Sequence, residues 1–261
     1  MTKNTHTFHI PVLGTGFSLD TPLKVAPLGI DSVISLSDDT LLEKLRKMYA
    51  SQYRLPFSGI TDKSPDARAR RITSYLNLLN TLVERKAQEL REAGAEKRKE
   101  ISEYFSMLPD SSALKQEFKA LKEKHINLAE IRSWLKKKLR IGSIDVNVMT
   151  KLDKTNYAGG KPLPQEYNDA HAAVRGYAES NVHSTIIFSA GMNPRLYSYL
   201  EQFDDFYPDA GGHINKKIAL KVSDYRSAFI QGRFLAKKGL WVSEYRIESG
   251  LNCGGHAFAS D

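Results

Sequence analysis

Residues 184–248 decide the fold, because three short strand-like runs in this stretch are separated by segments with helical periodicity. The runs are Ser184-Thr-Ile-Ile-Phe188, Lys217-Ile-Ala-Leu-Lys-Val222 and Val242-Ser-Glu-Tyr-Arg-Ile-Glu248. Pro194 suits the first turn of the helix after the first run. The helix after the second run is expected to have Ser223 as its N-cap and to end at Gly239. Apolar strands that alternate with helices indicate a parallel sheet covered by helices.

The same alternation continues toward the N-terminus, outside residues 62–140. We expect further strands at residues 9–13, 32–36 and 143–149, and helices at residues 21–29, 40–52 and 165–179. Thr21 is expected to cap its helix with Pro22 at the first helical position, and Asp38 and Asp39 precede the next helix. A Gly/Pro-rich loop is expected at residues 157–164. The prediction therefore has six strands.

Residues 62–140 read as an inserted block of three or four helices. Apolar side chains recur at helical spacing between Ile72 and Val83, and Asn127 with Glu130 has the spacing of a capping box. Trp134 is expected to pack in the core of this block. The predicted organisation is a first part of the sheet over residues 1–61, the helical insertion over 62–140, and the rest of the sheet over 141–261.

The positive charge of the chain is concentrated in the helical block. The chain has a net charge of +8, and residues 62–140 alone hold nineteen Lys and Arg against twelve Asp and Glu, or +7. Charges of both signs alternate along this block, which favours solvated helix surfaces over a nucleic-acid interface. The dense cluster Lys136–Lys138 keeps one alternative open, a basic binding module for RNA or an acidic partner.

Two α/β architectures are consistent with the alternation. A doubly wound sheet usually places Gly-x-Gly-x-x-Gly after its first strand, but Gly14-Thr-Gly-Phe-Ser-Leu19 lacks the third glycine. Polar and glycine-rich residues follow most strands, as at the catalytic face of a (β/α)8 TIM barrel. We therefore expect a barrel-type fold with about six of its eight β/α units. The remaining strands would come from a longer protein, a partner or a homo-oligomer.

The last predicted strand leads into Gly254-Gly-His256, and its context resembles a known family. The order of a Pro-hydrophobic strand with a glycine turn, Val146-Asn-Val148, Ile186-Ile-Phe-Ser-Ala-Gly191 and a β-α-β unit closing on Gly-Gly-His is similar to the nitronate monooxygenases, or 2-nitropropane dioxygenases. These are FMN-dependent TIM barrels, and flavin-dependent enoyl reductases share the plan. The likeness covers residues 8–60 and 142–258.

This resemblance implies a flavin site at the ends of the strands. By the resemblance, His256 would be the active-site base, and Gly254 and Gly255 would let the backbone approach FMN. Gly14, Thr15 and Gly16 would lie against the isoalloxazine edge, with Asn147 bonded to the ring or ribityl chain. Lys221, at the end of its strand, is grouped with these cofactor-binding residues. No metal ligand is predicted.

The chain also departs from the family pattern. Asn252 and Cys253 replace the usual acidic residue and alanine before Gly-Gly-His, and a second Gly-Gly-His, Gly211–His213, is expected on the surface. Two alternatives therefore stay open beside oxidation of a small substrate over flavin: an NAD(P)H-dependent flavin reductase, and the non-enzymatic basic module. Cys253 is the lone cysteine, which suits a reducing cytoplasm, and the sequence predicts neither export nor a membrane span.

Overall fold

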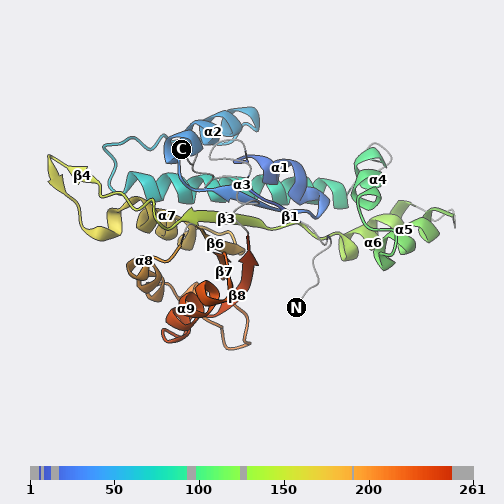
Figure 1. The fold of residues 1–261 in the computed structure, drawn as a ribbon. Helices are drawn as coiled ribbons and strands as arrows, with labels where there is room; N and C mark the ends of the chain where they lie inside the picture. The colour runs from blue at the N-terminus through green and yellow to red at the C-terminus, as the bar shows by residue number, and fades with distance from the viewer. Residues whose placement is uncertain are drawn as a thin grey trace, which may run out of the picture. The chain divides into compact units, whose positions relative to one another are not determined.

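The computed structural model describes residue 6 and residues 9–12, 18–92, 98–123, 128–189 and 191–248. Their central feature is a curled six-stranded sheet, an open half-barrel in which the ladders are parallel and the order is β1-β2-β3-β6-β7-β8 (Figure 1). The six strands are β1 His9–Ile10, β2 Asp31–Ser35, β3 Ile144–Met149, β6 Thr185–Ser189, β7 Lys217–Val222 and β8 Val242–Ile247.

The strand order excludes the doubly wound alternative. In a doubly wound sheet the order of the strands reverses at a switch point, so that the first strand lies inside the sheet. These six strands instead lie side by side in chain order. The prediction of a six-stranded parallel α/β fold is confirmed. Within the described part of the chain no strand joins β1 to β8, so the sheet is not a full TIM barrel.

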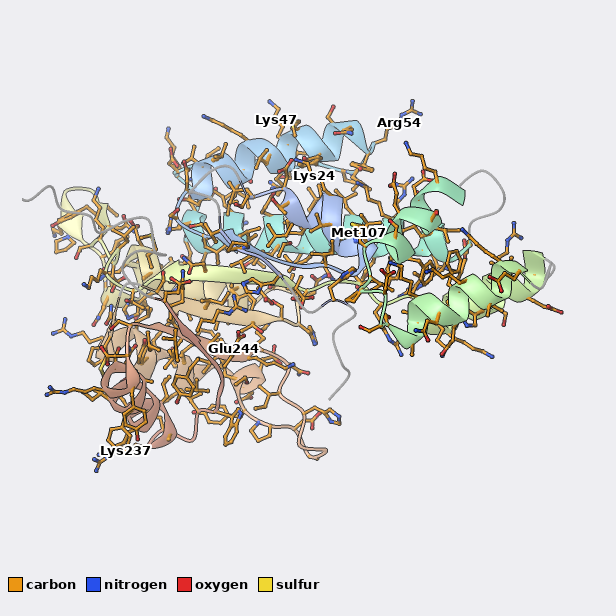
Figure 2. The ribbon with its side chains drawn as sticks, turned by 45° about the vertical axis from the view of Figure 1, so that its right-hand side comes forward. Lys24, Lys47, Arg54, Met107, Lys237 and Glu244 are labelled. Atoms are coloured by element: carbon orange, nitrogen blue, oxygen red, sulfur yellow. The ribbon has the colours of Figure 1, made fainter. Side chains whose placement is uncertain are left out.

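Nine α-helices occur among the described residues, and most lie where the sequence predicts them. Their bounds are α1 Thr21–Val25, α2 Asp39–Gln52, α3 Ala67–Arg91, α4 Arg98–Ser106, α5 Ala113–Glu123, α6 Leu128–Lys138, α7 Asp169–Ala178, α8 Pro194–Tyr199 and α9 Tyr225–Ala236. Asp38 caps α2 as expected, accepting a hydrogen bond from the Leu41 N–H at 2.9 Å. Charged side chains of α2 such as Lys47 extend away from the helix (Figure 2).

Several local predictions are wrong, each for an identifiable reason. Thr21 is not an N-cap: Asp20 holds that position, and Pro22 fits the first turn because the N–H groups there need no helical partner. Asp224, not Ser223, caps α9, since its carboxylate accepts the N–H of Ser227 at 2.7 Å while the Ser223 hydroxyl donates to Asp224.

Two further boundaries differ from the prediction. The helix expected at 165–179 begins at Asp169 after a short 3-10 turn, because Asn168 takes an extended conformation. The loop at 157–164 contains a hairpin, β4 Tyr157–Ala158 and β5 Lys161–Pro162, joined by Gly159 and Gly160 at φ of +58° and +76°. Two central residues with positive φ make a type I′ turn, which suits a two-residue hairpin loop. The strand expected at 9–13 is shorter in the structure, where β1 ends at Ile10 and residues 11–12 are not in a strand, while residue 13 lies outside the described residues.

The described chain divides into two compact units. One comprises residues 1–34 and 77–144, and the other comprises residues 35–76 and 145–261. The first unit contains a core of its own built by α3 to α6, in which Phe105 stacks on Phe118 at 3.8 Å between ring centroids. Trp134 packs against this core, as predicted, and its indole N–H donates to Glu117. The Asn127 capping box lies outside the described residues.

The second unit contains β3 from Asp145 onward, the whole of β6, β7 and β8, and a layer of helices. On one face of the sheet the side chains are apolar and buried, and Phe188 of β6 contacts Tyr197 of α8 with 5.2 Å between ring centroids. The other members of this face are Val146, Val148, Ile186, Ile218 and Leu220. Helices α7 to α9 therefore cover this face and leave the other as the concave side of the half-barrel (Figure 1).

Within this unit, the backbones of α3 and α7 come close together at Gly176. A Cβ at this position would lie 2.7 Å from the carbonyl oxygen of Ala69 and 2.8 Å from Cβ of Ile72. The Thr73 hydroxyl also donates to the Gly176 carbonyl at 2.9 Å. Glycine is needed here because both backbones occupy the space of a side chain.

We expect Gly176→Ala to destabilise the protein by about 1–3 kcal/mol, because overpacking moves one helix backbone away from the other. Urea unfolding followed by circular dichroism measures the change. Gly59→Ala is the matched control, since a Cβ there meets only the Phe57 ring at 3.6 Å, an ordinary contact. Equal stability of Gly176→Ala and the wild type would contradict the close approach of the helices.

Candidate functional site

The concave face of the half-barrel carries polar and charged side chains at its carboxyl edge. Residues of neighbouring strands that share a register position point to the same face, so Asn147, Ile187 and Ala219 form one row. Lys221 lies one pleat further along β7, on the same face, and is the register partner of Arg246 on β8. Of the residues predicted to bind a cofactor, the structure thus brings Asn147 and Lys221 to one side of the sheet.

Acidic groups accompany the two cations of this face. Lys221 Nζ lies 2.8 Å from a carboxylate oxygen of Glu248. Arg246 binds Glu244 through Nε at 2.8 Å, and its Nη2 is 3.9 Å from the buried carboxylate of Asp145. Asp145 also accepts the N–H of Thr185 at 3.0 Å, which fixes the carboxylate between β3 and β6. The concave face therefore presents ordered ammonium, guanidinium and amide donors.

These donors fit the chemistry of the predicted cofactor. FMN has acceptor oxygens and nitrogens along the pyrimidine edge of its ring and a dianionic phosphate, and amide and cationic side chains are the groups that bind such atoms. The other predicted site residues, Gly14, Thr15, Gly16, Gly254, Gly255 and His256, lie outside the described residues, as does Cys253. His213 is on the surface as predicted, with its side chain 82% exposed in the loop before β7.

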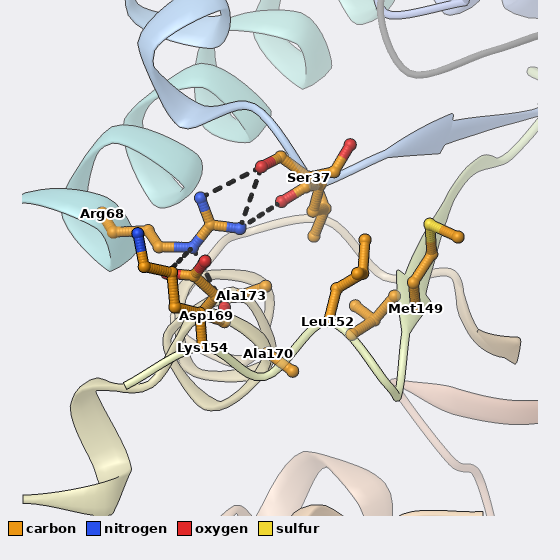
Figure 3. Close-up of a pocket in the computed structure, with 10 residues that line it drawn as sticks. Ser37, Arg68, Met149, Leu152, Lys154, Asp169, Ala170 and Ala173 are labelled. Carbon is orange, nitrogen blue, oxygen red and sulfur yellow. Dashed lines mark hydrogen bonds and ion pairs between the residues drawn. The ribbon is translucent and has the colours of Figure 1, made fainter. Parts of the chain in front are cut away.

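A cavity of about 210 Å³ lies on the opposite, helix-covered face, at the carboxyl ends of β2 and β3 (Figure 3). Its wall is mostly apolar, with polar groups from Ser37, Arg68, Lys154 and Asp169. The apolar lining residues are Leu36, Val148, Met149, Leu152, Ala170 and Ala173. Among the lining residues, Val148 belongs to the helix-covered face, whereas Met149, at the end of β3, follows the alternation of Asn147. Asn147 is not one of the residues that line the cavity.

The Arg68 side chain organises this cavity wall. Its guanidinium donates to the carbonyl oxygens of Leu36 at 2.8 Å and Asp169 at 3.0 Å (Figure 3). It also donates to the carboxylate of Asp39 at 2.6 Å. Arg71, one turn later, binds the second oxygen of Asp39 at 2.9 Å. The arginine pair thus ties the β2–α2 turn to α3 and to the start of α7.

A buried histidine–aspartate pair lies beside the cavity at the N-terminus of α7. Nδ1 of His171 is 2.9 Å from Oδ2 of Asp153, and Oδ1 of Asp153 accepts the N–H of Ala170 at 3.0 Å. Burial alone would raise the pKa of the Asp153 carboxyl, but the hydrogen bonds from His171 and the helix N-terminus outweigh it and hold the pKa below its ordinary value.

Lys216 is a second buried titratable group, at the amino end of β7. Desolvation lowers the pKa of its ammonium to about 8, an effect that the nearby Asp205 carboxylate opposes. Nζ donates to the carbonyl oxygens of Ser180 and Val182 at 2.8 and 2.7 Å. Lys216 thus holds the turn that precedes β6. This turn lies at the amino ends of the strands, away from the carboxyl ends where the cofactor is predicted, so we interpret Lys216 as a structural residue.

Sequence reasoning missed Arg68, Arg71, Asp153 and His171. The two arginines carried a detectable signal, since residues three apart share one side of a helix and here lie beside the apolar stripe that starts at Ile72. No such signal was present for Asp153 and His171, which are separated by a loop and a hairpin. Of the basic cluster Lys136–Lys138, Lys138 is paired with Glu117 at 2.9 Å.

Comparisons of the chain with models of known protein families, with curated proteins and with solved structures found no match. None of the described helices is long and apolar enough to cross a membrane. In the same part of the chain, no group of three or more His, Cys, Asp or Glu side chains could hold a metal ion.

Asp153→Asn should destabilise the protein by about 1–3 kcal/mol at neutral pH, because hydrogen bonds to a charged acceptor are lost. A carboxyl whose folded pKa is lowered contributes stability above its unfolded pKa, and that contribution disappears as the pH falls through the folded value. The difference between wild type and variant should therefore shrink below about pH 4. Urea unfolding at several pH values tests this, and a difference independent of pH would contradict it.

Arg68→Lys should cost about 2–4 kcal/mol, since an ammonium cannot replace the forked donors that serve four acceptors at once, the carbonyls of Leu36, Ser37 and Asp169 and the carboxylate of Asp39. The matched control is Lys154→Ala, which removes an exposed cation from the rim of the same cavity and should change stability by less than about 0.5 kcal/mol. Comparable losses in the two variants, measured by urea unfolding, would show that the Arg68 contacts do not hold the wall.

Proposed function

We propose that the protein is an FMN-dependent oxidoreductase of the nitronate monooxygenase type, acting on a small substrate at the carboxyl ends of the strands. The observation that carries the proposal is the pair of register partners Lys221 and Arg246 on the concave side of a parallel half-barrel. Barrel enzymes bind their ligands at this end of the strands. The resemblance of the sequence around Gly254–His256 supports the same assignment.

The residues of the concave face have separate parts in this proposal. Lys221 would place its ammonium at the pyrimidine edge of the flavin, where a positive charge favours the anionic reduced ring. Glu248 holds that ammonium at 2.8 Å and so limits its rotation. Asn147 would donate its amide hydrogens to ring or ribityl oxygens. Bound FMN would supply the two-electron redox chemistry.

His256 is the proposed base. The pKa of an imidazole lies near neutrality, so a neutral histidine is available at physiological pH to take a proton from the carbon beside a nitro group. In the proposed arrangement the proton moves to the histidine while the protein orients the substrate over the ring. A substrate of this class is small, and its nitro oxygens accept hydrogen bonds from donors such as the Asn147 amide.

Lys221→Met should weaken FMN binding by about tenfold or more, because one charge-assisted contact is worth about 1.5–3 kcal/mol. Quenching of flavin fluorescence during titration with the protein measures the dissociation constant. Lys217→Met is the matched control, since Lys217 has the same side-chain type on the same face of β7 but lies at the amino end of the strand. Equal affinity of the two variants would contradict the assigned position of the flavin.

The overall proposal is tested by the visible absorption spectrum of the folded, FMN-equilibrated protein after removal of free flavin. Retained flavin that is reduced by a neutral nitroalkane, and not in the His256→Ala variant, is the expected result. Reduction by NAD(P)H in place of the nitroalkane would favour a flavin reductase. Failure of the folded protein to retain any flavin would overturn the proposal.

A further inference from the structure

The outer edge of β8 carries backbone groups that are positioned for strand pairing. β8 is the last strand in the sheet order, and the N–H of Glu248 donates to the carbonyl of Val222 on β7. Because backbone direction alternates along a strand, Tyr245 and Ile247 direct their N–H and C=O groups toward the outer edge, beyond the register shift of β8 between Val242 and Glu244. In the described part of the chain no strand pairs with this edge, and such edges readily pair with another chain.

Apolar side chains continue this edge on the helix-covered side. Gly232 of α9 packs against the Tyr245 hydroxyl, and Phe229 and Tyr225 follow at helical spacing along the same stripe. The rings of Tyr225 and Phe229 stack with their centroids 6.2 Å apart, although Tyr225 is 81% exposed. Ile247 is 73% exposed. Contiguous exposed apolar side chains of this kind mark interaction surfaces.

The charges on the concave side of β8 select one kind of partner. A two-fold axis perpendicular to the sheet keeps the concave faces of the two copies on the same side. The axis must therefore pass between one residue and the same residue of the second copy. An axis at Tyr245 places Glu244 opposite Arg246 of the second copy, twice. An axis at Glu244 would instead oppose two like carboxylates, which is unfavourable. Beyond the register shift between Val242 and Glu244, β8 is therefore complementary to itself in the register centred on Tyr245.

We propose that two copies of the chain pair through β8, antiparallel about a two-fold axis at Tyr245, and form one continuous sheet across the dimer. The two Tyr245 residues then exchange their backbone hydrogen bonds at the axis. The α9 helices of both copies lie on the same side of the joined sheet, so the Tyr225 and Phe229 flanks meet there. An isologous contact of this kind closes after two subunits.

The position of the axis is tested by cross-linking. In a Cys253→Ser background, Tyr245→Cys should give a disulfide-linked dimer under mild oxidation, because directly opposed residues have Cα atoms about 5.5 Å apart, within disulfide range. Ser243→Cys in the same background is the control, since its two copies would be about 14 Å apart along the strands. Equal cross-linking of both variants, or none with Tyr245→Cys, would overturn the proposed register.

The existence of the dimer is tested by light scattering after size-exclusion chromatography over a range of protein concentrations. The wild-type chain should be a dimer, and Ile247→Lys should be a folded monomer at the same concentrations. Leu152→Lys is the matched control, because it places the same charge at another exposed aliphatic side chain, in the loop after β3. This variant should remain dimeric. A monomeric wild type, or an Ile247→Lys variant that stays dimeric, would overturn the proposal.

Discussion

The in-register parallel ladder of β3, β6 and β7 is the constraint on which the rest of the structure depends. Parallel strands need a crossover connection, and such connections are almost always right-handed. When the strands lie in chain order, right-handed crossovers all pass over the same face of the sheet. All the covering helices therefore lie on one face, which must be apolar, and Val146, Ile186 and Ile218 satisfy this requirement. The opposite face is left to Asp145, Asn147 and the charged ends of β7 and β8.

The repeated pattern of the sequence predicted the architecture because burial imposes that pattern directly. A strand covered on its helix side reads as an apolar run, and each of the six runs became a strand in the expected order. Helix caps were less predictable. Ser223 and Asp224 are both good capping residues, and the choice between them depends on which side chain reaches the N–H of Ser227. Sequence alone does not contain that geometry.

The candidate site was predictable only in part, for a related physical reason. Asn147 and Lys221 were found because polar residues at strand ends stand out against apolar neighbours. The Arg68 contacts with Leu36, Asp39 and Asp169 join segments that are distant in the sequence, and the helical spacing of Arg68 and Arg71 does not show which segments they reach. The cavity that these contacts enclose has an ordinary core-like lining, which composition does not distinguish from packing.

The hairpin formed by β4 and β5 offers a permissive point for engineering. A side chain added at Gly159 or Gly160 would meet nothing within 4 Å, and the strands on either side are exposed. Since the ends of a two-residue turn are close together, a folded tag or a fluorescent reporter with neighbouring termini can be inserted between the two glycines with little distortion of the flanking backbone. Such a reporter would label the protein without occupying either end of the chain.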